Sequence, residues 1–218
     1  MPQTETWKNI ETALAPRWDD ALWSRGSTYA VLARAFEYPE ETNLEYLRLC
    51  AEEGELSGEA ARRLRAWLEE VASSSLEDLQ HQHTAMFRPK GGPPPYEVQY
   101  RKFKDEFARA QELADIMGFY KAFGVEPRNE RPDHLCAELE FMHYLVVKEK
   151  YARHQEDEEN AELCRDAREK FFAEHLGDWV EDFAKEARAQ EIDEVAPLYA
   201  ELVEVLDTFI RSEQEKQS

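Results

Sequence analysis

The segment PDHLCAELEFMHYLV, residues 132–146, has the most informative helical pattern in the chain. At about 100° per residue, four residues share one narrow face: His134, Glu138, Phe141 and Leu145. The adjoining face is apolar: Leu135, Leu139, Met142 and Val146. We expect a helix that starts with Pro132 at or just before its favoured first position, has Asp133 in its first turn, and runs to about Tyr151.

The rest of the chain has the same helical character. Only 8 glycines occur among 218 residues, helix-forming residues dominate, and the alternation of β-branched residues that is typical of strands is missing. Further helices are expected over residues 18–36, 43–52, 57–71, 76–87, 98–123 with a break near Gly118, 161–175, 178–190 and 193–211. The last carries a broad apolar stripe: Val195, Leu198, Tyr199, Leu202, Val205, Leu206 and Phe209. The pattern predicts an all-α fold.

One long irregular stretch interrupts this pattern, RPKGGPPPYE at residues 88–97. Its glycines and prolines are incompatible with a helix. It is either a linker between two helical parts or a stiff, aromatic-tipped loop that lines a groove. We therefore expect a single compact domain over residues 1–218, with an N-terminal part at 1–87, a Pro-rich loop at 88–98 and a C-terminal part at 99–218.

The charge balance is strongly acidic, with 27 basic and 47 acidic residues and a formal net charge of −20. Such a field repels phosphate backbones and anionic lipid surfaces, which argues against nucleic acid or membrane partners. It attracts basic ligands, although acidity can also serve solubility alone.

The three cysteines, Cys50, Cys136 and Cys164, are widely spaced and form no CxxC pair. They predict reduced thiols rather than disulfides or a zinc ribbon. Neither an export signal nor a span-length apolar run is recognisable, so we expect a cytoplasmic protein without membrane insertion.

Glu138 falls inside the apolar arc of the predicted 132–151 helix. A carboxylate in that position costs several kcal/mol to desolvate unless it is paired. Its partner could be an internal arginine, His134 one turn earlier, or a cation from a bound ligand.

Motifs for catalysis are weak. Glu140 and His143 have the Glu-x-x-His spacing of di-iron helical bundles, but no second copy occurs in the chain. His81 and His83 would point apart on a helix and cannot share a metal. Neither a nucleophile elbow nor a glycine-rich phosphate loop is present. We predict no catalytic residue, metal site or cofactor.

Several segments, in order, resemble one known family, the TorD/DmsD/NarJ-like chaperones of molybdenum-cofactor enzymes. The most specific are ERPDHL at 130–135 and ELEFM at 138–142, which resemble the family's E-x-P-D-H…E-L-E-F-M signature. Four further segments are similar to family elements: TAMF at 84–87, PYE at 95–97 followed by Tyr100, FYKAFG at 119–124, and HLGDW at 175–179.

The resemblance implies an all-helical fold of two closely packed parts and a cytoplasmic chaperone without turnover of its own. Such proteins bind the N-terminal region, often a twin-arginine leader, of the apo catalytic subunit of an oxidoreductase of the dimethyl-sulfoxide-reductase type. They hold it back from export and assist insertion of its molybdenum cofactor.

By the same resemblance, Asp133 and His134 are the first candidates for the peptide site, with Pro132 fixing the loop. Phe87, Tyr96, Glu97 and Tyr100 are candidates for the opposite wall, and Glu138 is a candidate to receive a cation. Packing of these side chains in the core is an alternative. The rival functions are a helical metal-dependent or nucleotide-hydrolysing enzyme, and a permanent accessory subunit of the oxidoreductase.

Overall fold

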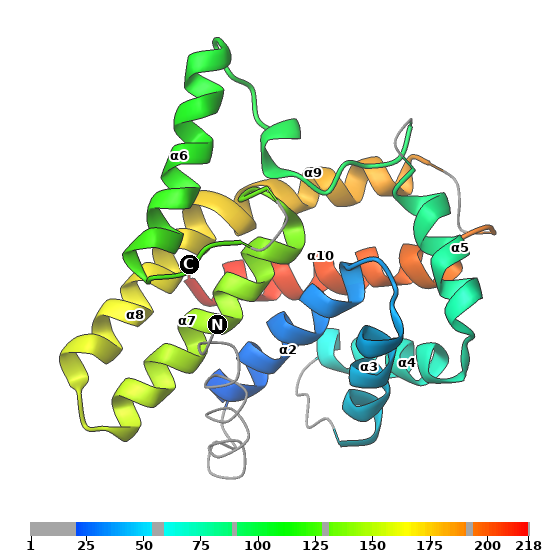
Figure 1. Ribbon diagram of the computed structural model, residues 1–218, viewed down its shortest axis with the longest axis horizontal. Coiled ribbons are helices and arrows are strands. Elements are labelled where there is room, and N and C mark those ends of the chain that lie inside the picture. Colours follow the sequence, from blue (N-terminus) through cyan, green and yellow to red (C-terminus); the bar gives the residue numbers. More distant parts are fainter. Residues whose placement is uncertain (1–20, 54–58, 89–90, 128–130, 191–193, 218) are drawn as a thin grey trace.

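The computed structural model describes residues 21–53, 59–88, 91–127, 131–190 and 194–217. All regular elements within these residues are helical, which confirms the predicted fold class (Figure 1). The α-helices are α2 (Ala21–Phe36), α3 (Glu41–Glu53), α4 (Glu59–Ser73), α5 (Leu76–Met86), α6 (Glu106–Ala122), α7 (Leu135–His154), α8 (Glu158–Phe171), α9 (Gly177–Arg188) and α10 (Pro197–Gln217). Two short elements join them: the 3-10 helix η2 (Glu97–Gln99) and the π-helical turn η3 (Phe172–Leu176).

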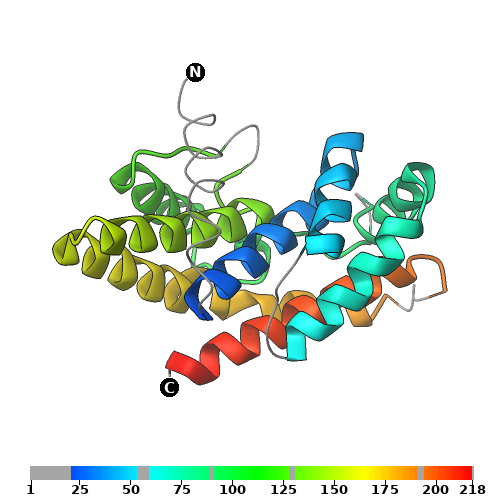
Figure 2. The same ribbon diagram turned by 90° about the horizontal axis from the view of Figure 1, so that it is seen from below.

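Two helices organise the core. Helix α7 packs against α2 on one side and α8 on the other, while α10 packs against α4 and α9 (Figure 2). Because α7 is covered on more than one side, its buried residues extend around the helix and include Glu138 and Glu149. Polar groups enclosed in this way need partners inside the protein.

The predicted helix ends differ in several places from those observed. The predicted starts at residues 18, 57 and 193 lie outside the described residues. The stripe on α10 is buried as expected, except that Val195 precedes the helix and is half exposed. The helical region expected over residues 98–123 starts too early in the prediction: η2 and an irregular segment come first. Helix α6 begins after Asp105, whose side chain caps it by accepting from the Ala108 N–H at 2.9 Å.

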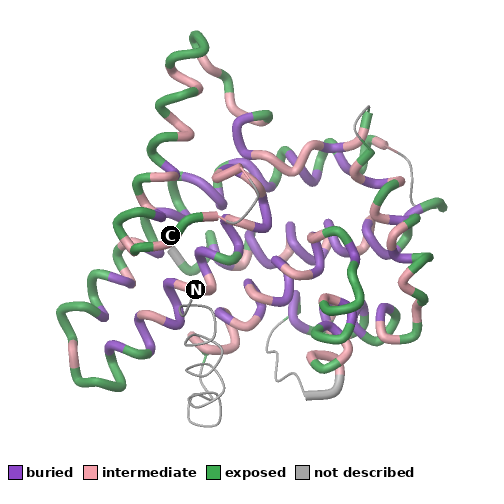
Figure 3. Tube along the Cα trace, in the orientation of Figure 1, coloured by how far each residue is buried: buried purple, intermediate pink, exposed green. Residues whose placement is uncertain are grey.

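Helix α6 projects from the body of the protein, and the half nearest its start is largely exposed (Figure 3). It runs through Gly118 without the predicted break. Only Ile116 and Tyr120, in its second half, are buried. The helix is therefore anchored at its C-terminal end, next to the start of α7.

Helices α8 and α9 form one nearly continuous run in which η3 is a π-helical insertion. A Cβ atom on Gly177 would lie 2.7 Å from the Phe172 carbonyl oxygen, so the close turn requires glycine there. The extra residue of the π turn places His175 and Leu176 toward the interior.

Across the described residues, no helix is both long enough and apolar enough to cross a bilayer.

Candidate binding groove

A groove of about 800 Å³ lies where the ends of α2, α5 and α6 meet the first half of α7. Its walls are rich in aromatic and apolar side chains: Phe36, Phe87, Pro95, Tyr120, Phe141 and Tyr144. Its charged lining residues are Arg34, Glu37, Glu40, Glu126 and Glu140. Four carboxylates against one guanidinium make the groove acidic, so it combines apolar surface with a preference for cations.

His134 forms part of the groove wall and also begins α7. Its Nδ1 accepts a hydrogen bond from the Cys136 N–H at 3.2 Å, which makes His134 the N-cap and leaves the ring hydrogen on Nε2. Burial lowers the pKa of His134 to about 4, so the ring is neutral at physiological pH. The prediction that Pro132 stands at or just before the first helical position, with Asp133 in the first turn, is therefore wrong, because α7 begins at Leu135.

The PYE segment is fixed to the start of α7 by a short antiparallel bridge between Tyr96 and His134. The Glu97 N–H donates to the Asp133 carbonyl and the Leu135 N–H donates to the Pro95 carbonyl, each at 2.9 Å. The Tyr96 ring meets the His134 ring edge-on at 5.0 Å. This bridge places Pro95 and His134 on the same wall of the groove.

Asp133 is fully buried and does not line the groove. Its carboxylate accepts from Arg131 Nε at 2.9 Å and Nη2 at 2.7 Å, and from the Val98 N–H at 3.4 Å. Pro132 accepts from the Tyr120 hydroxyl at 2.8 Å through its carbonyl oxygen. Both residues hold the loop that carries His134, so their role in this structure is to position the groove wall.

Glu138 and Glu97 are also fully buried, behind the groove. Glu138 accepts from Trp179 Nε1 at 3.0 Å. Among the described residues it pairs with neither an arginine nor His134, two of the partners that the sequence left open. Burial first, and the Glu97 carboxylate second, raise the pKa of Glu138 well above its usual value. Glu138 Oε1 and Glu97 Oε2 meet no donor from other described residues, so a proton on Glu138 shared with Glu97 satisfies both carboxyl groups.

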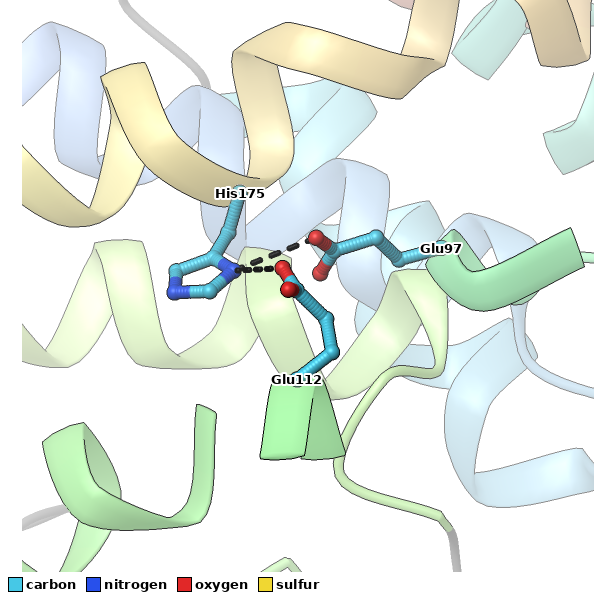
Figure 4. A group of neighbouring side chains, drawn as sticks. All are labelled: Glu97, Glu112 and His175. Atoms are coloured by element: carbon cyan, nitrogen blue, oxygen red, sulfur yellow. Dashed lines mark hydrogen bonds and ion pairs between the residues drawn. The ribbon is translucent and has the colours of Figure 1, made fainter. Parts of the chain in front are cut away.

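Glu97 connects the carboxyl pair that it forms with Glu138 to a second polar cluster, on the side of the protein away from the groove. Glu97, Glu112 and His175 point toward one another from η2, α6 and η3 (Figure 4), with His175 Nδ1 at 3.1 Å from Glu97 Oε1. In the described part of the chain, this trio and the group Asp115, Glu174 and His175 bring ligand-type atoms within 4.8 Å of one another.

Arg101 supplies the cation of this network. Its Nε lies 2.7 Å from Glu97 Oε1 and its Nη1 lies 2.6 Å from Glu112 Oε1. A metal ion would compete with this guanidinium for the same oxygens. We therefore interpret the cluster as an ion-pair network that ties η2 and the PYE segment to α6 and η3.

Tyr100 belongs to the opposite face as well. Its ring stacks on Trp179 at 5.5 Å, and both line a second, more open hollow of about 1100 Å³ between residues 100–103, α6 and α9. Of the eight predicted site residues, only Phe87 and His134 contribute side chains to the groove.

Sequence reasoning missed Arg34, Glu37 and Glu140, which lie at the groove's edge. Glu140 belongs to the ELEFM segment, and its position on the exposed side of the predicted helix could have identified it as a residue open to a ligand. Arg34 and Glu37 come from another helix end, so their proximity to Glu140 is a property of the tertiary structure.

An acidic, all-helical protein with an open aromatic groove fits the class of proteins that bind another polypeptide. Comparison with known families makes the assignment specific. Residues 51–185, more than half of the chain, match the family described as "Nitrate reductase delta subunit". The chain belongs to this family.

Three relatives are named as assembly chaperones. The chlorate reductase assembly chaperone protein of Ideonella dechloratans and the selenate reductase assembly chaperone protein of Thauera selenatis are each 28% identical over 183 residues, covering 82% of this chain and 85% of the relative. The perchlorate reductase assembly chaperone protein of Dechloromonas aromatica strain RCB is 29% identical over 107 residues, covering 48% of this chain and 46% of that protein.

Proposed function

We propose that this protein is a cytoplasmic assembly chaperone for a molybdenum oxidoreductase of the dimethyl-sulfoxide-reductase type. It binds the apo catalytic subunit through its N-terminal leader and holds it while the cofactor is inserted, before export or assembly. The observation that carries this proposal is the groove, which places carboxylates beside aromatic side chains in a chain of this family.

The groove's chemistry matches a leader that carries arginines next to an apolar run. The aromatic walls offer burial worth about 25 cal/mol per Å² of apolar surface. The carboxylates offer charge-assisted hydrogen bonds to guanidinium groups, which orient the peptide. The net charge of −20 adds long-range attraction for a basic segment.

The architecture we propose is that of the TorD-like chaperones. An N-terminal part at about 1–87 and a C-terminal part at about 99–218 pack closely on either side of the Pro-rich loop at 88–98. In this arrangement the chain is one chaperone domain, and the PYE end of the loop supports the groove between the two parts.

Calorimetric titration with a synthetic leader peptide tests this proposal. The matched pair of variants is Ala137→Trp, on the half-buried groove wall, and Ala110→Trp, on the exposed face of α6. We expect the indole at residue 137 to fill the groove and weaken binding at least about tenfold, or about 1.4 kcal/mol, while the variant at residue 110 binds as the wild type does.

Two outcomes would contradict the proposal. Equal binding by both tryptophan variants would place the peptide elsewhere, and no binding by the wild-type protein would remove the leader as ligand. Gel filtration of the mature oxidoreductase tests the accessory-subunit alternative, because a chaperone is missing from the finished enzyme. Metal analysis of the purified protein tests the metalloenzyme alternative.

A further inference from the structure

An arginine of the protein itself occupies the charged edge of the groove. Arg34 Nη1 lies 2.8 Å from Glu37 Oε1, and Arg34 Nη2 lies 3.2 Å from Glu140 Oε1. Glu37 directly follows α2, whereas Glu140 lies on α7, so the guanidinium bridges two helices. Among the described residues that line the groove, Arg34 is the one lysine or arginine.

The Glu37 carboxylate is held in place by a second partner, and the site stays open to solvent. Asn43 Nδ2 donates to Glu37 Oε2 at 2.7 Å, which fixes that side chain from α3. The side chains of Arg34, Glu37 and Glu140 are 41%, 29% and 48% exposed. A second guanidinium can therefore reach the same oxygens from outside.

We propose that Arg34 is an internal stand-in for an arginine of the client, and that Glu37 and Glu140 form the subsite that receives it. This inference rests on the proposed function and deepens it. The incoming guanidinium takes over both carboxylates while Arg34 turns into solvent. Because the carboxylates exchange one guanidinium for another, they are never left unpaired, and the exchange avoids the desolvation penalty of an empty site.

The ligand expected for this subsite is a peptide in which an arginine guanidinium lies directly beside apolar side chains. Phe141 lies one residue from Glu140, and Tyr144 one turn further along α7, so apolar groups next to the client's arginine meet aromatic walls. A planar fork can contact two carboxylates at once, whereas a lysine ammonium acts as a point charge. The subsite should thus prefer arginine to lysine.

Titration of three synthetic peptides tests the proposal: one with two adjacent arginines before an apolar run, one with two lysines and one with two glutamines in their place. Arg34→Gln removes the internal competitor and should tighten binding of the arginine peptide roughly two- to fivefold, the range expected for a partly exposed ion pair. It should leave the glutamine peptide unchanged. Glu140→Gln should weaken binding of the arginine peptide and reduce the preference for arginine over lysine.

Arg63→Gln is the matched control. Arg63 makes a comparable half-exposed ion pair with Glu201 at 3.0 Å, between α4 and α10 and outside the groove lining. The Arg63→Gln variant loses the same charge as Arg34→Gln. If it also binds the arginine peptide more tightly than the wild type does, the effect is a general one of net charge and the proposal is overturned.

The proposal would also be overturned if the Arg34→Gln variant bound the arginine peptide no more tightly than the wild type does. Arg34 would then serve only to connect α2 with α7. That result leaves the proposed function intact. A wild-type protein that binds none of the three peptides would overturn the proposed function, and this inference with it.

Discussion

Glu138→Gln should make the protein progressively more stable than the wild type as the pH rises above about 5. Glutamine reproduces the protonated carboxyl group: its carbonyl oxygen accepts from Trp179 and its amide group donates to Glu97. Near pH 4 the two proteins should have similar free energies of unfolding. The gap should then open by up to about 1.4 kcal/mol per pH unit.

The direction of this pH dependence follows from the difference in proton binding by Glu138 between the folded and the unfolded protein. Burial and the Glu97 carboxylate raise the pKa of Glu138 in the folded protein, whereas the unfolded chain releases the proton near pH 4.3. Between these two pKa values the folded state binds one more proton than the unfolded state. The stability that this proton contributes to the wild-type protein is therefore fully present below the pKa of Glu138 in the unfolded chain. It is lost as the pH rises toward the pKa of Glu138 in the folded protein.

Urea denaturation of both proteins from pH 4 to pH 9 measures the gap. The variant's difference from wild type isolates Glu138 from other titrating groups, such as His134, whose lowered pKa acts in the opposite direction. Exposed Glu45→Gln is the control and should follow the wild-type profile. Parallel profiles for Glu138→Gln and wild type would mean that Glu138 is ionised in the folded protein.

Asp133→Ala should lower the free energy of unfolding by about 1–3 kcal/mol, the cost of leaving buried polar groups without partners. The Val98 N–H would lose its acceptor, and Arg131 would lose a bidentate partner. The cost stays below that of a fully buried pair because the Arg131 side chain is 41% exposed and can turn to water. Peptide affinity should also fall, because the loop that orients His134 loosens.

Asp133→Asn separates positioning from direct contact. The amide oxygen can still accept from the Val98 N–H, so this variant should recover part of the stability and part of the peptide affinity. Chemical denaturation and calorimetric titration of both variants provide the two readouts. Unchanged stability in Asp133→Ala together with lost binding would mean instead that Asp133 contacts the peptide directly.

The fold class could be predicted because helical periodicity is a local property. The 132–146 segment and the apolar stripe of the last helix show it: residues 135–146 and the stripe from Leu198 onward are observed as helix with buried apolar residues. The break at Gly118 was wrong because one glycine costs a helix only about 1 kcal/mol, which neighbouring turns can offset. The start of α6 was missed because apolar residues continue upstream of Asp105.

The start of α7 shows the limit of local rules. Asp133 has a strong preference for capping a helix, yet its carboxylate is occupied by its neighbour Arg131 and by the Val98 N–H from 35 positions upstream, and His134 becomes the cap. Likewise, the pattern showed that Glu138 would be enclosed, but its partner Trp179 lies 41 positions further along the chain. The pair of Arg34 with Glu37 has local i, i+3 spacing, but the pair of Arg34 with Glu140 joins α2 to α7 and cannot be inferred from spacing alone.

Site-specific photocross-linking to the apo catalytic subunit tests the central claim most directly, that the groove holds the client's leader. A benzophenone side chain at exposed Tyr38, on the groove's rim, should cross-link to the N-terminal leader. The same group at exposed Leu163 on α8, outside the groove lining, should not. Cross-links to the leader from residue 163 but not from residue 38 would contradict the account.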